Sequence, residues 1–323
     1  MSWQKVNAVQ WNDALVVIPH TIFFHEDFLN IISLVYSASL NFMLYRKGDE
    51  LLAATAFFSK ENSVITPVEF YYHPYFLKEQ LIEVTYLQIH EELLSYLKKN
   101  YSAIQLKLDV NLTDIRPFIW AGFRVDNKYT YIKNGDTEPH YGVLKKLRKQ
   151  DAREYYLKVE APNEQSIGLN IDFHSSGLGF SKNFCSEYRS LLQRWADAGY
   201  LKAFNVYRAQ RHICSNLTLL DMNNKKAYQI LLNNVSNEEK YAHTFLYQKV
   251  FEWCFENGFD TVDMCGANIQ SISKFKSYYN GTLTPYFKVS YSPYQNKAYG
   301  IAQAAANKLF RIKNVFSFLR SKN

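Results

Sequence analysis

A repeated order of segments constrains the fold of this chain more than any other sequence feature. A long run of helical periodicity at residues 78–100 leads to a strand-like segment, a short aromatic segment ended by Gly122, and a closing strand. The same order recurs after a second helical run at 238–257, passes Gly281 and ends in a strand at 286–291. Two copies of one pattern indicate a duplicated α/β domain, with a mixed sheet flanked by helices.

The length and composition of the chain agree with two domains. Its 323 residues suit two units of roughly 150 residues each, and 47% hydrophobic and 16% aromatic content can fill two cores. We place the boundary near Gly135. The sequence therefore predicts an α/β (α+β mixed sheet) fold of two tandem domains, 1–135 and 136–299, followed by a basic amphipathic segment at 300–323.

The charge of the chain points to anionic partners. A net charge of +7 favours phosphates, nucleic acid or an anionic membrane surface. The four cysteines are scattered and form no Cys-x-x-Cys pair, so we expect reduced thiols and no metal site. The amino-terminal residues lack the apolar run of a signal peptide, and no run approaches the ~18 residues of a membrane span. A cytoplasmic protein is expected.

Further elements are predicted from periodicity and turn residues. In the first half we expect a strand at 14–18, a helix at 26–37, a hairpin at 42–58, and strands at 64–72, 103–110 and 124–133. In the second half we expect a basic helix at 145–158, a loose segment after Pro162, a helix at 183–198, and strands at 203–208, 213–221 and 227–232.

The stretch after the second long helix is the strongest candidate site. A short buried strand at 261–264 carries Asp263 near its carboxyl end, Gly266 lies in a tight turn, and a short helix carries Lys274, Phe275 and Lys276. Ligands of α/β proteins collect at the carboxyl ends of strands. The alternative stays open that Asp263 only ties a loop and that the two lysines form a solvated face.

Two other groups of residues have both a functional and a structural interpretation. Asp114 and Arg116 occupy the corresponding place in the first half, where they would bind an acceptor phosphate or carboxylate, or form a helix cap and a structural ion pair. Lys145, Lys146 and Lys149 belong to a densely basic segment. That segment would bind a polyanion or serve only as a solubilising face.

The order of elements resembles the acyltransferase fold related to Gcn5, usually called GNAT, and two such domains in tandem resemble the FemAB/FemX aminoacyltransferases. Two stretches carry the likeness: residues 114–125 with Tyr129-Thr130-Tyr131, and residues 259–266 followed by Lys274-Phe275-Lys276. The resemblance implies an acyltransferase or aminoacyltransferase that needs no enzyme nucleophile. In this reading Lys276 holds donor phosphates or stabilises the oxyanion, Asp263 orients the amine or accepts its proton, and Phe275 shapes the acyl pocket.

Departures from the family pattern leave the donor open. Tyr279-Asn280-Gly281 stands where the family often has Phe-Gly, and neither half has the Arg-x-x-Gly-x-Gly/Ala loop for coenzyme A. Glu238 and Glu239 at the corresponding helix start are expected to repel a pyrophosphate. We expect no tightly bound cofactor and either aminoacyl-tRNA or acyl-CoA as donor.

The expected acceptor is an amine on a cell-envelope precursor, either a peptidoglycan peptide or an amino sugar. Such a precursor bears phosphate or is linked to lipid. The alternatives are a catalytically silent tandem binding module and an acyl-CoA-dependent N-acetyltransferase. The apolar residues of 301–319 recur at three and four residues among cations, so this segment either docks on the domains or contacts anionic lipid at the inner membrane face.

Overall fold

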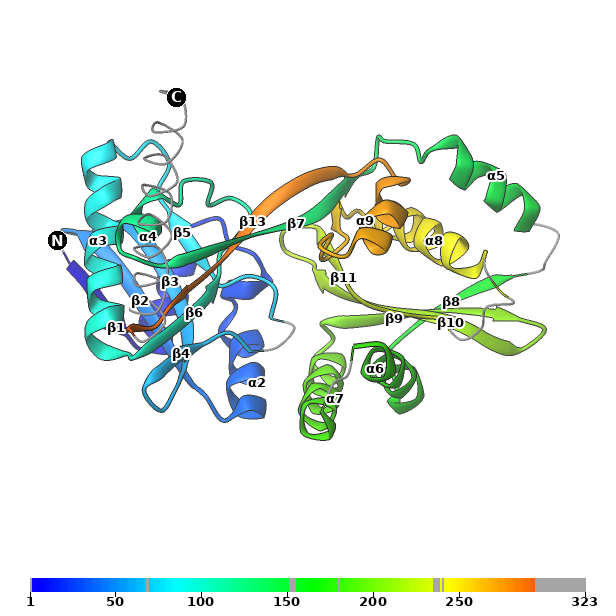
Figure 1. The fold of residues 1–323 in the computed structure, drawn as a ribbon, viewed down its shortest axis with the longest axis horizontal. Helices are drawn as coiled ribbons and strands as arrows, with labels where there is room; N and C mark the ends of the chain where they lie inside the picture. Colours follow the sequence, from blue (N-terminus) through cyan, green and yellow to red (C-terminus); the bar gives the residue numbers. More distant parts are fainter. Residues whose placement is uncertain are drawn as a thin grey trace, which may run out of the picture.

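A continuous mixed sheet runs through both halves of the molecule (Figure 1). The computed structural model describes residues 2–67, 70–150, 155–178, 181–234, 239 and 241–293. Within these ranges thirteen strands form one sheet, with the order β1-β2-β3-β4-β6-β13-β7-β12-β11-β10-β9-β8 and with β5 paired to β3. The predicted fold class, an α/β protein with a large mixed sheet, is confirmed.

The first half contains the elements up to β7. They are β1 (Ser2–Val6), α1 (Ala8–Leu15), η1 (Ile22–Phe24), α2 (Glu26–Tyr36), β2 (Ser39–Lys47), β3 (Glu50–Lys60), β4 (Ser63–Ile65), β5 (Tyr75–Leu77), α3 (Glu83–Asn100), β6 (Ala103–Lys107), α4 (Arg116–Trp120) and β7 (Arg124–Asn134).

The second half repeats the order of strand, long helix, strand, short helix and strand. Its elements are α5 (Tyr141–Gln150), β8 (Tyr156–Glu160), α6 (Glu164–Leu178), α7 (Lys182–Asp197), β9 (Leu201–Arg208), β10 (Arg211–Asp221), β11 (Lys226–Asn234), α8 (Ala242–Glu256), β12 (Thr261–Asp263), α9 (Gln270–Ser277) and β13 (Thr282–Tyr291). None of the helices in the described ranges combines the length and apolarity needed to cross a bilayer.

The last strand of the second half lies inside the sheet of the first half. β13 pairs antiparallel with β7 along Thr282–Ser290 and with β6 along Lys288–Tyr291. β7 in turn pairs with β12 on its other edge. In Figure 1 the long β7 and β13 run together from one half of the molecule to the other. The division at residue 135 therefore does not coincide with a break in the sheet.

One hydrophobic core also joins the halves. Phe28 of α2 stacks on Trp195 of α7 with ring centroids 4.7 Å apart, and Phe23 meets Tyr228 of β11 edge-on at 5.0 Å. These rings belong to one buried cluster with members from both halves. Whether 1–135 and 136–299 can fold as separate domains stays a prediction.

The structure corrects the predicted start of the chain. Residues 14–18 are not a strand, because α1 covers Ala8–Leu15. The Asn7 side chain accepts from the Gln10 amide at 2.9 Å, and the Gln10 side chain accepts from the Asn7 amide at 3.2 Å. This capping box starts a helix whose apolar residues Trp11, Ala14 and Leu15 are buried at helical spacing.

Three other predicted segments also differ. The strand expected at 64–72 is shorter, because β4 ends at Ile65 before Pro67. The loose segment after Pro162 is mostly α6, which buries Ile167 and Ile171 one turn apart between polar neighbours. The basic helix ends at Gln150, and Lys158 lies on β8, where it pairs with Glu160 at 2.6 Å.

Candidate functional site

A tight turn after β12 forms the centre of the candidate site. Cys265 and Gly266 both adopt left-handed backbone conformations, with φ of 50° and 83°. Only glycine adopts such a φ without cost, so Cys265 is held there by its surroundings. The turn leads into α9, which brings Lys276 back against it.

Lys276 ties this turn together. Its Nζ donates to the carbonyls of Met264, Cys265 and Gly266 at 2.5, 2.9 and 2.7 Å. The side chain is buried, and that burial lowers its pKa to about 8. An ammonium has three N–H donors, and here all three are used by the protein backbone. In this arrangement Lys276 is a structural clamp, and its predicted contact with a donor phosphate or an oxyanion requires it to release a carbonyl.

Asp263 links the two halves beneath the turn. Its Oδ1 accepts from the Thr130 hydroxyl of β7 at 2.5 Å and from the Cys265 amide at 2.8 Å. Its Oδ2 accepts from the hydroxyl of Tyr72, in the first half, at 2.8 Å. Burial raises the pKa of this carboxyl against the effect of those donors. Asp263 lies close enough to Lys276 for their charges to interact, while its catalytic role stays a prediction.

Phe275 lies in the core of the second half. Its ring packs edge-on against Tyr247 at 5.0 Å and Tyr279 at 5.5 Å. These contacts account for a phenylalanine at this position without a ligand, and its role in an acyl pocket stays untested.

The strands separate next to Asp263. In the described residues β12 pairs with β11 along Lys226–Tyr228, with Tyr228 opposite Asp263, while β11 continues to Asn234. Beyond Tyr228 the edge of β11 that faced β12 loses its strand partner. A hydroxyl from the first half reaches this region, because Tyr71 donates to the carbonyl of Ile230 at 3.0 Å.

Two groups at this separation were missed by the sequence analysis. Tyr228 is 4% exposed, and its hydroxyl makes no hydrogen bond to the described residues. Burial and the negative charges of Asp221, Asp263 and Asp109 raise its pKa. Asp109, just beyond β6, is 8% exposed, and burial raises the pKa of its carboxyl although Lys226 lies nearby. Asp263 thus lies near a second buried carboxyl and near a hydroxyl that has no hydrogen-bond partner in the part of the chain that the structure describes.

The comparisons with known proteins concern the fold. No protein-family model matches the sequence, and no curated protein does. Solved structures do match. FemX superposes with a TM-score of 0.61 at 10% identity, covering 89% of this chain and 97% of FemX. L-PGS from Bacillus licheniformis gives 0.54 at 11% identity, covering 88% and 92%. A tandem GNAT protein from the clavulanic acid biosynthesis pathway gives 0.52 at 10%, covering 90% and 98%.

The chain has a tandem GNAT fold. The resemblance to FemAB/FemX inferred from the motifs is thus confirmed at the level of the fold. In this fold the separation of β11 and β12 belongs to the second GNAT unit, and Tyr71 and Tyr72 of the first unit reach into it.

Asp114 and Arg116 lie elsewhere in the tandem GNAT fold. They flank the start of α4, which Figure 1 shows in the first half, well apart from α9. The expected cap is displaced by one residue, because Ile115 is the N-cap while Asp114 accepts from the Arg116 amide at 3.0 Å. Arg116 also pairs with Glu83 at 3.2 Å, and the hydrogen bonds from its side chain lower the pKa of Asp114. The structure therefore provides a structural ion pair at this place.

The basic residues Lys145, Lys146 and Lys149 are exposed on α5, while Val143 on the same helix is buried. Val143 and Leu147 pack into the core of the second GNAT unit. α5 is thus an amphipathic helix whose basic face meets solvent. Its binding to a polyanion stays a prediction.

The carboxylate of Glu239 is buried and paired. Its side chain is 1% exposed, and Oε1 pairs with Arg208 at 2.7 Å and with Arg211 at 3.2 Å. Two cations offset the charge of this one carboxylate, while the expected repulsion of a pyrophosphate by Glu238 and Glu239 together stays a prediction. Glu238 lies outside the described residues. The predicted basic amphipathic segment at 300–323 also lies outside them.

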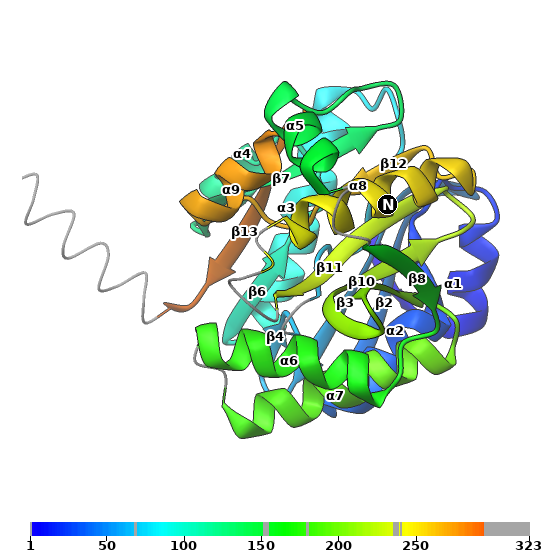
Figure 2. The same ribbon diagram turned by 90° about the vertical axis from the view of Figure 1, so that its right-hand side faces the viewer.

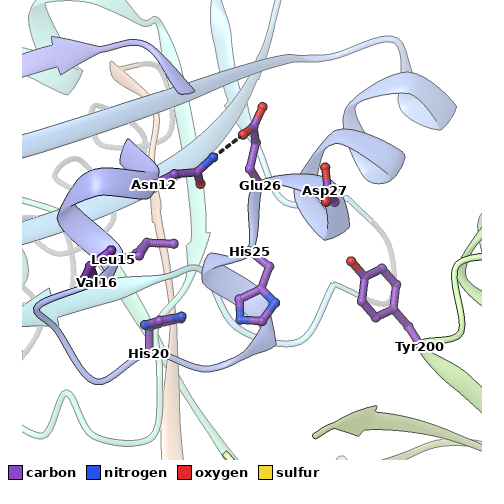
Figure 3. Close-up of a pocket in the computed structure, with 8 residues that line it drawn as sticks. All are labelled: Asn12, Leu15, Val16, His20, His25, Glu26, Asp27 and Tyr200. Carbon is purple, nitrogen blue, oxygen red and sulfur yellow. Dashed lines mark hydrogen bonds between the residues drawn. The ribbon is translucent and has the colours of Figure 1, made fainter. Parts of the chain in front are cut away.

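A separate polar pocket of about 360 Å³ lies where α1 and α2 face Tyr200 (Figure 3). The rings of His20 and His25 stand 5.2 Å apart here. Burial and the neighbouring His20 lower the pKa of His25. Glu26, also in the lining, is held by the Asn12 amide at 2.6 Å. Among the described residues, His, Cys, Asp and Glu side chains do not gather into a group that could hold a metal ion.

Proposed function

We propose that this protein is an acyltransferase or aminoacyltransferase that moves an activated group onto an amine of a cell-envelope precursor, a peptidoglycan peptide or an amino sugar. The observation that carries the proposal is the Tyr228 hydroxyl, which has no hydrogen-bond partner among the described residues and lies near the buried carboxyls of Asp109 and Asp263, where β11 and β12 separate. The fold shared with FemX and L-PGS supports the same class of reaction.

The chemistry assigns a task to each group. An acceptor ammonium is attracted to Asp109, whose burial-raised pKa makes it a better proton acceptor than an ordinary aspartate. The neutral amine then attacks the carbonyl carbon of the activated ester or thioester. The Tyr228 hydroxyl donates to the developing oxyanion, and the leaving alcohol or thiol departs with a proton. Asp263 and Lys276 hold the turn and the strand end in place.

The donor in this proposal is either aminoacyl-tRNA or acyl-CoA. The pairing of Glu239 with two arginines supports acyl-CoA as the donor, because the two positive charges offset the expected repulsion between Glu239 and the phosphates of coenzyme A. The acceptor would carry phosphate or a lipid, and transfer would take place in the cytoplasm or at the inner face of the membrane.

A catalytically silent binding module is the second candidate function. It is favoured by the complete use of the Lys276 protons and by the three hydrogen bonds that Asp263 accepts. Both groups can be explained by stability alone.

The test is a transfer assay with both donor classes and with precursors bearing a free amine. We expect Asp109→Asn and Tyr228→Phe to lower the rate by about 100-fold or more, the usual contribution of one acid–base or oxyanion group. Asp126→Asn and Tyr129→Phe are the matched controls, because both residues lie on β7 and about a third of each is exposed, in contrast to the buried Asp109 and Tyr228. If the wild type binds a precursor yet transfers nothing from either donor, the silent module is the better description.

A further inference from the structure

The β9–β10 hairpin places two arginines directly opposite each other. Its two-residue turn consists of Ala209 and Gln210, both in left-handed conformations, with φ of 46° and 65°. Such a turn matches the twist of the strands and fixes their register. In that register Arg208 and Arg211 are cross-strand partners. Like charges in this position repel each other and destabilise the pair.

One buried carboxylate holds both arginines. Oε1 of Glu239 forms ion pairs with Nη2 of Arg208 at 2.7 Å and with Nη2 of Arg211 at 3.2 Å. Tyr155 donates its hydroxyl to the other carboxylate oxygen. The Glu239 side chain is thus closed off, whereas those of Arg208 and Arg211 remain 38% and 59% exposed.

The charges and donors of this cluster do not balance. Two guanidiniums carry two positive charges, and Glu239 supplies one negative charge. Each guanidinium has five N–H donors, more than the carboxylate oxygen that they share can use. Within the described part of the chain the cluster therefore has an excess positive charge and unused N–H donors on two partly exposed side chains, held in place by a buried anchor.

The surroundings of the cluster are aromatic, and a nearby carboxylate is neutralised. The Arg208 guanidinium lies 6.0 Å from the ring centroid of Tyr155, and Tyr156 stacks on Tyr207 at 5.6 Å. Glu160, on the same strand as Tyr156, is already paired with Lys158. The β9–β10 hairpin, the start of β8 and the basic helix α5 lie at one end of the molecule (Figures 1 and 2).

We propose that Arg208 and Arg211, held on Glu239, form a phosphate-binding site. The planar guanidinium forks match the oxygens of a phosphate ester, and Arg is the residue best suited to this recognition. The phosphate belongs to a nucleotide of the coenzyme A type or to an RNA backbone, which share this chemistry. The site does not depend on the transfer reaction proposed above.

Binding titrations of the full-length chain test this site with three probes: inorganic pyrophosphate, coenzyme A and a short single-stranded RNA. We expect Arg211→Gln to weaken binding of at least one probe by tenfold or more, and Arg208→Gln to do the same. Arg211→Gln leaves the 2.7 Å pair between Arg208 and Glu239 intact, so its melting temperature should stay close to that of the wild type.

Arg189→Gln is the matched control. Arg189 is 40% exposed and pairs with one carboxylate, Asp172, at 3.6 Å. Selective loss of coenzyme A binding identifies a nucleotide ligand, and selective loss of RNA binding identifies a nucleic-acid backbone. The proposal is overturned if no probe binds at millimolar concentration, or if Arg211→Gln and Arg189→Gln weaken binding equally.

Discussion

At the scale of single residues, Lys276 shows how a buried charge stabilises a backbone turn. Three carbonyls in succession would repel one another without a cation between them, and the ammonium supplies it. Its removal leaves three buried acceptors without a donor. We therefore expect loss of transfer in Lys276→Ala to come with loss of the turn, and not from the absence of an oxyanion donor alone.

Lys276→Met should lower the free energy of unfolding by roughly 3 kcal/mol, the order expected for buried hydrogen bonds from a charged group. The effect should depend on pH. Burial lowers the folded-state pKa to about 8 from the ordinary 10.5, so the unfolded chain binds more protons between these values. The stability of the wild type relative to Lys276→Met should therefore rise from pH 8 to 10.5, as measured by urea denaturation. Lys274→Met, an exposed neighbour on α9, should show neither effect.

The candidate site was only partly predictable from sequence. Asp263 and Lys276 follow one another within a short stretch, and their motif placed them together. Tyr72 is 191 residues from Asp263 along the chain, and no local pattern links the two. Tyr228 lies on β11 among apolar residues, where a tyrosine is ordinarily interpreted as part of the hydrophobic core. A hydroxyl without a partner is a property of the folded molecule, so the sequence could not reveal it.

At the scale of elements, local signals predicted most of the secondary structure. The hairpin of β2 and β3, most of the long helices α3 and α8, and strands β9 to β12 lie where periodicity and turn residues indicated. α3 begins five residues later than the predicted helix at 78–100, and β13 begins four residues earlier than the predicted strand at 286–291. The failures have local causes. The capping box at Asn7 starts a helix that includes part of the apolar run at 14–18, so no strand forms there. α6 buries only a few side chains among many polar residues, so its helical periodicity was not recognised.

The basic face of α5 permits a test at this scale. We expect Lys145, Lys146 and Lys149, all changed to Glu, to weaken binding of RNA by about tenfold or more and to flatten its dependence on salt. The melting temperature should hardly change, because exposed substitutions usually cost within about 0.5 kcal/mol. The same charge reversal at the exposed Lys47, Lys99 and Lys182 is the control. Binding that ignores salt, or that survives the α5 reversal, would make this face a solubilising surface.

At the scale of the whole molecule, the two GNAT units share both sheet and core. β13 lies between β6 and β7, and the Phe28–Trp195 stack crosses between the halves. The duplication was visible in the sequence as a repeated order of elements. The position of β13 between β6 and β7 was not visible in the sequence, because pairing between distant strands produces no local sequence pattern.

A fragment of residues 1–135 should therefore not fold by itself. It lacks β13 between β6 and β7, and its Phe28 would lose the ring against which it stacks. We expect a poorly dispersed amide NMR spectrum and no cooperative thermal transition, whereas the full chain should melt cooperatively. A dispersed spectrum with a sharp transition would show that the first unit is an autonomous domain.

The position of β13 also determines when β7 can pair with its neighbours during synthesis on the ribosome. β7 emerges with neither of its neighbours, because β12 and β13 both come from the far end of the second half. About 150 residues separate Asn134 from Thr282, which at about 5–20 residues per second is a wait of roughly 8–30 s. Throughout that interval an eleven-residue strand has two open edges, a form that pairs readily with other chains. Nascent chains of this protein should therefore depend on a chaperone that covers β7 until translation has passed residue 291.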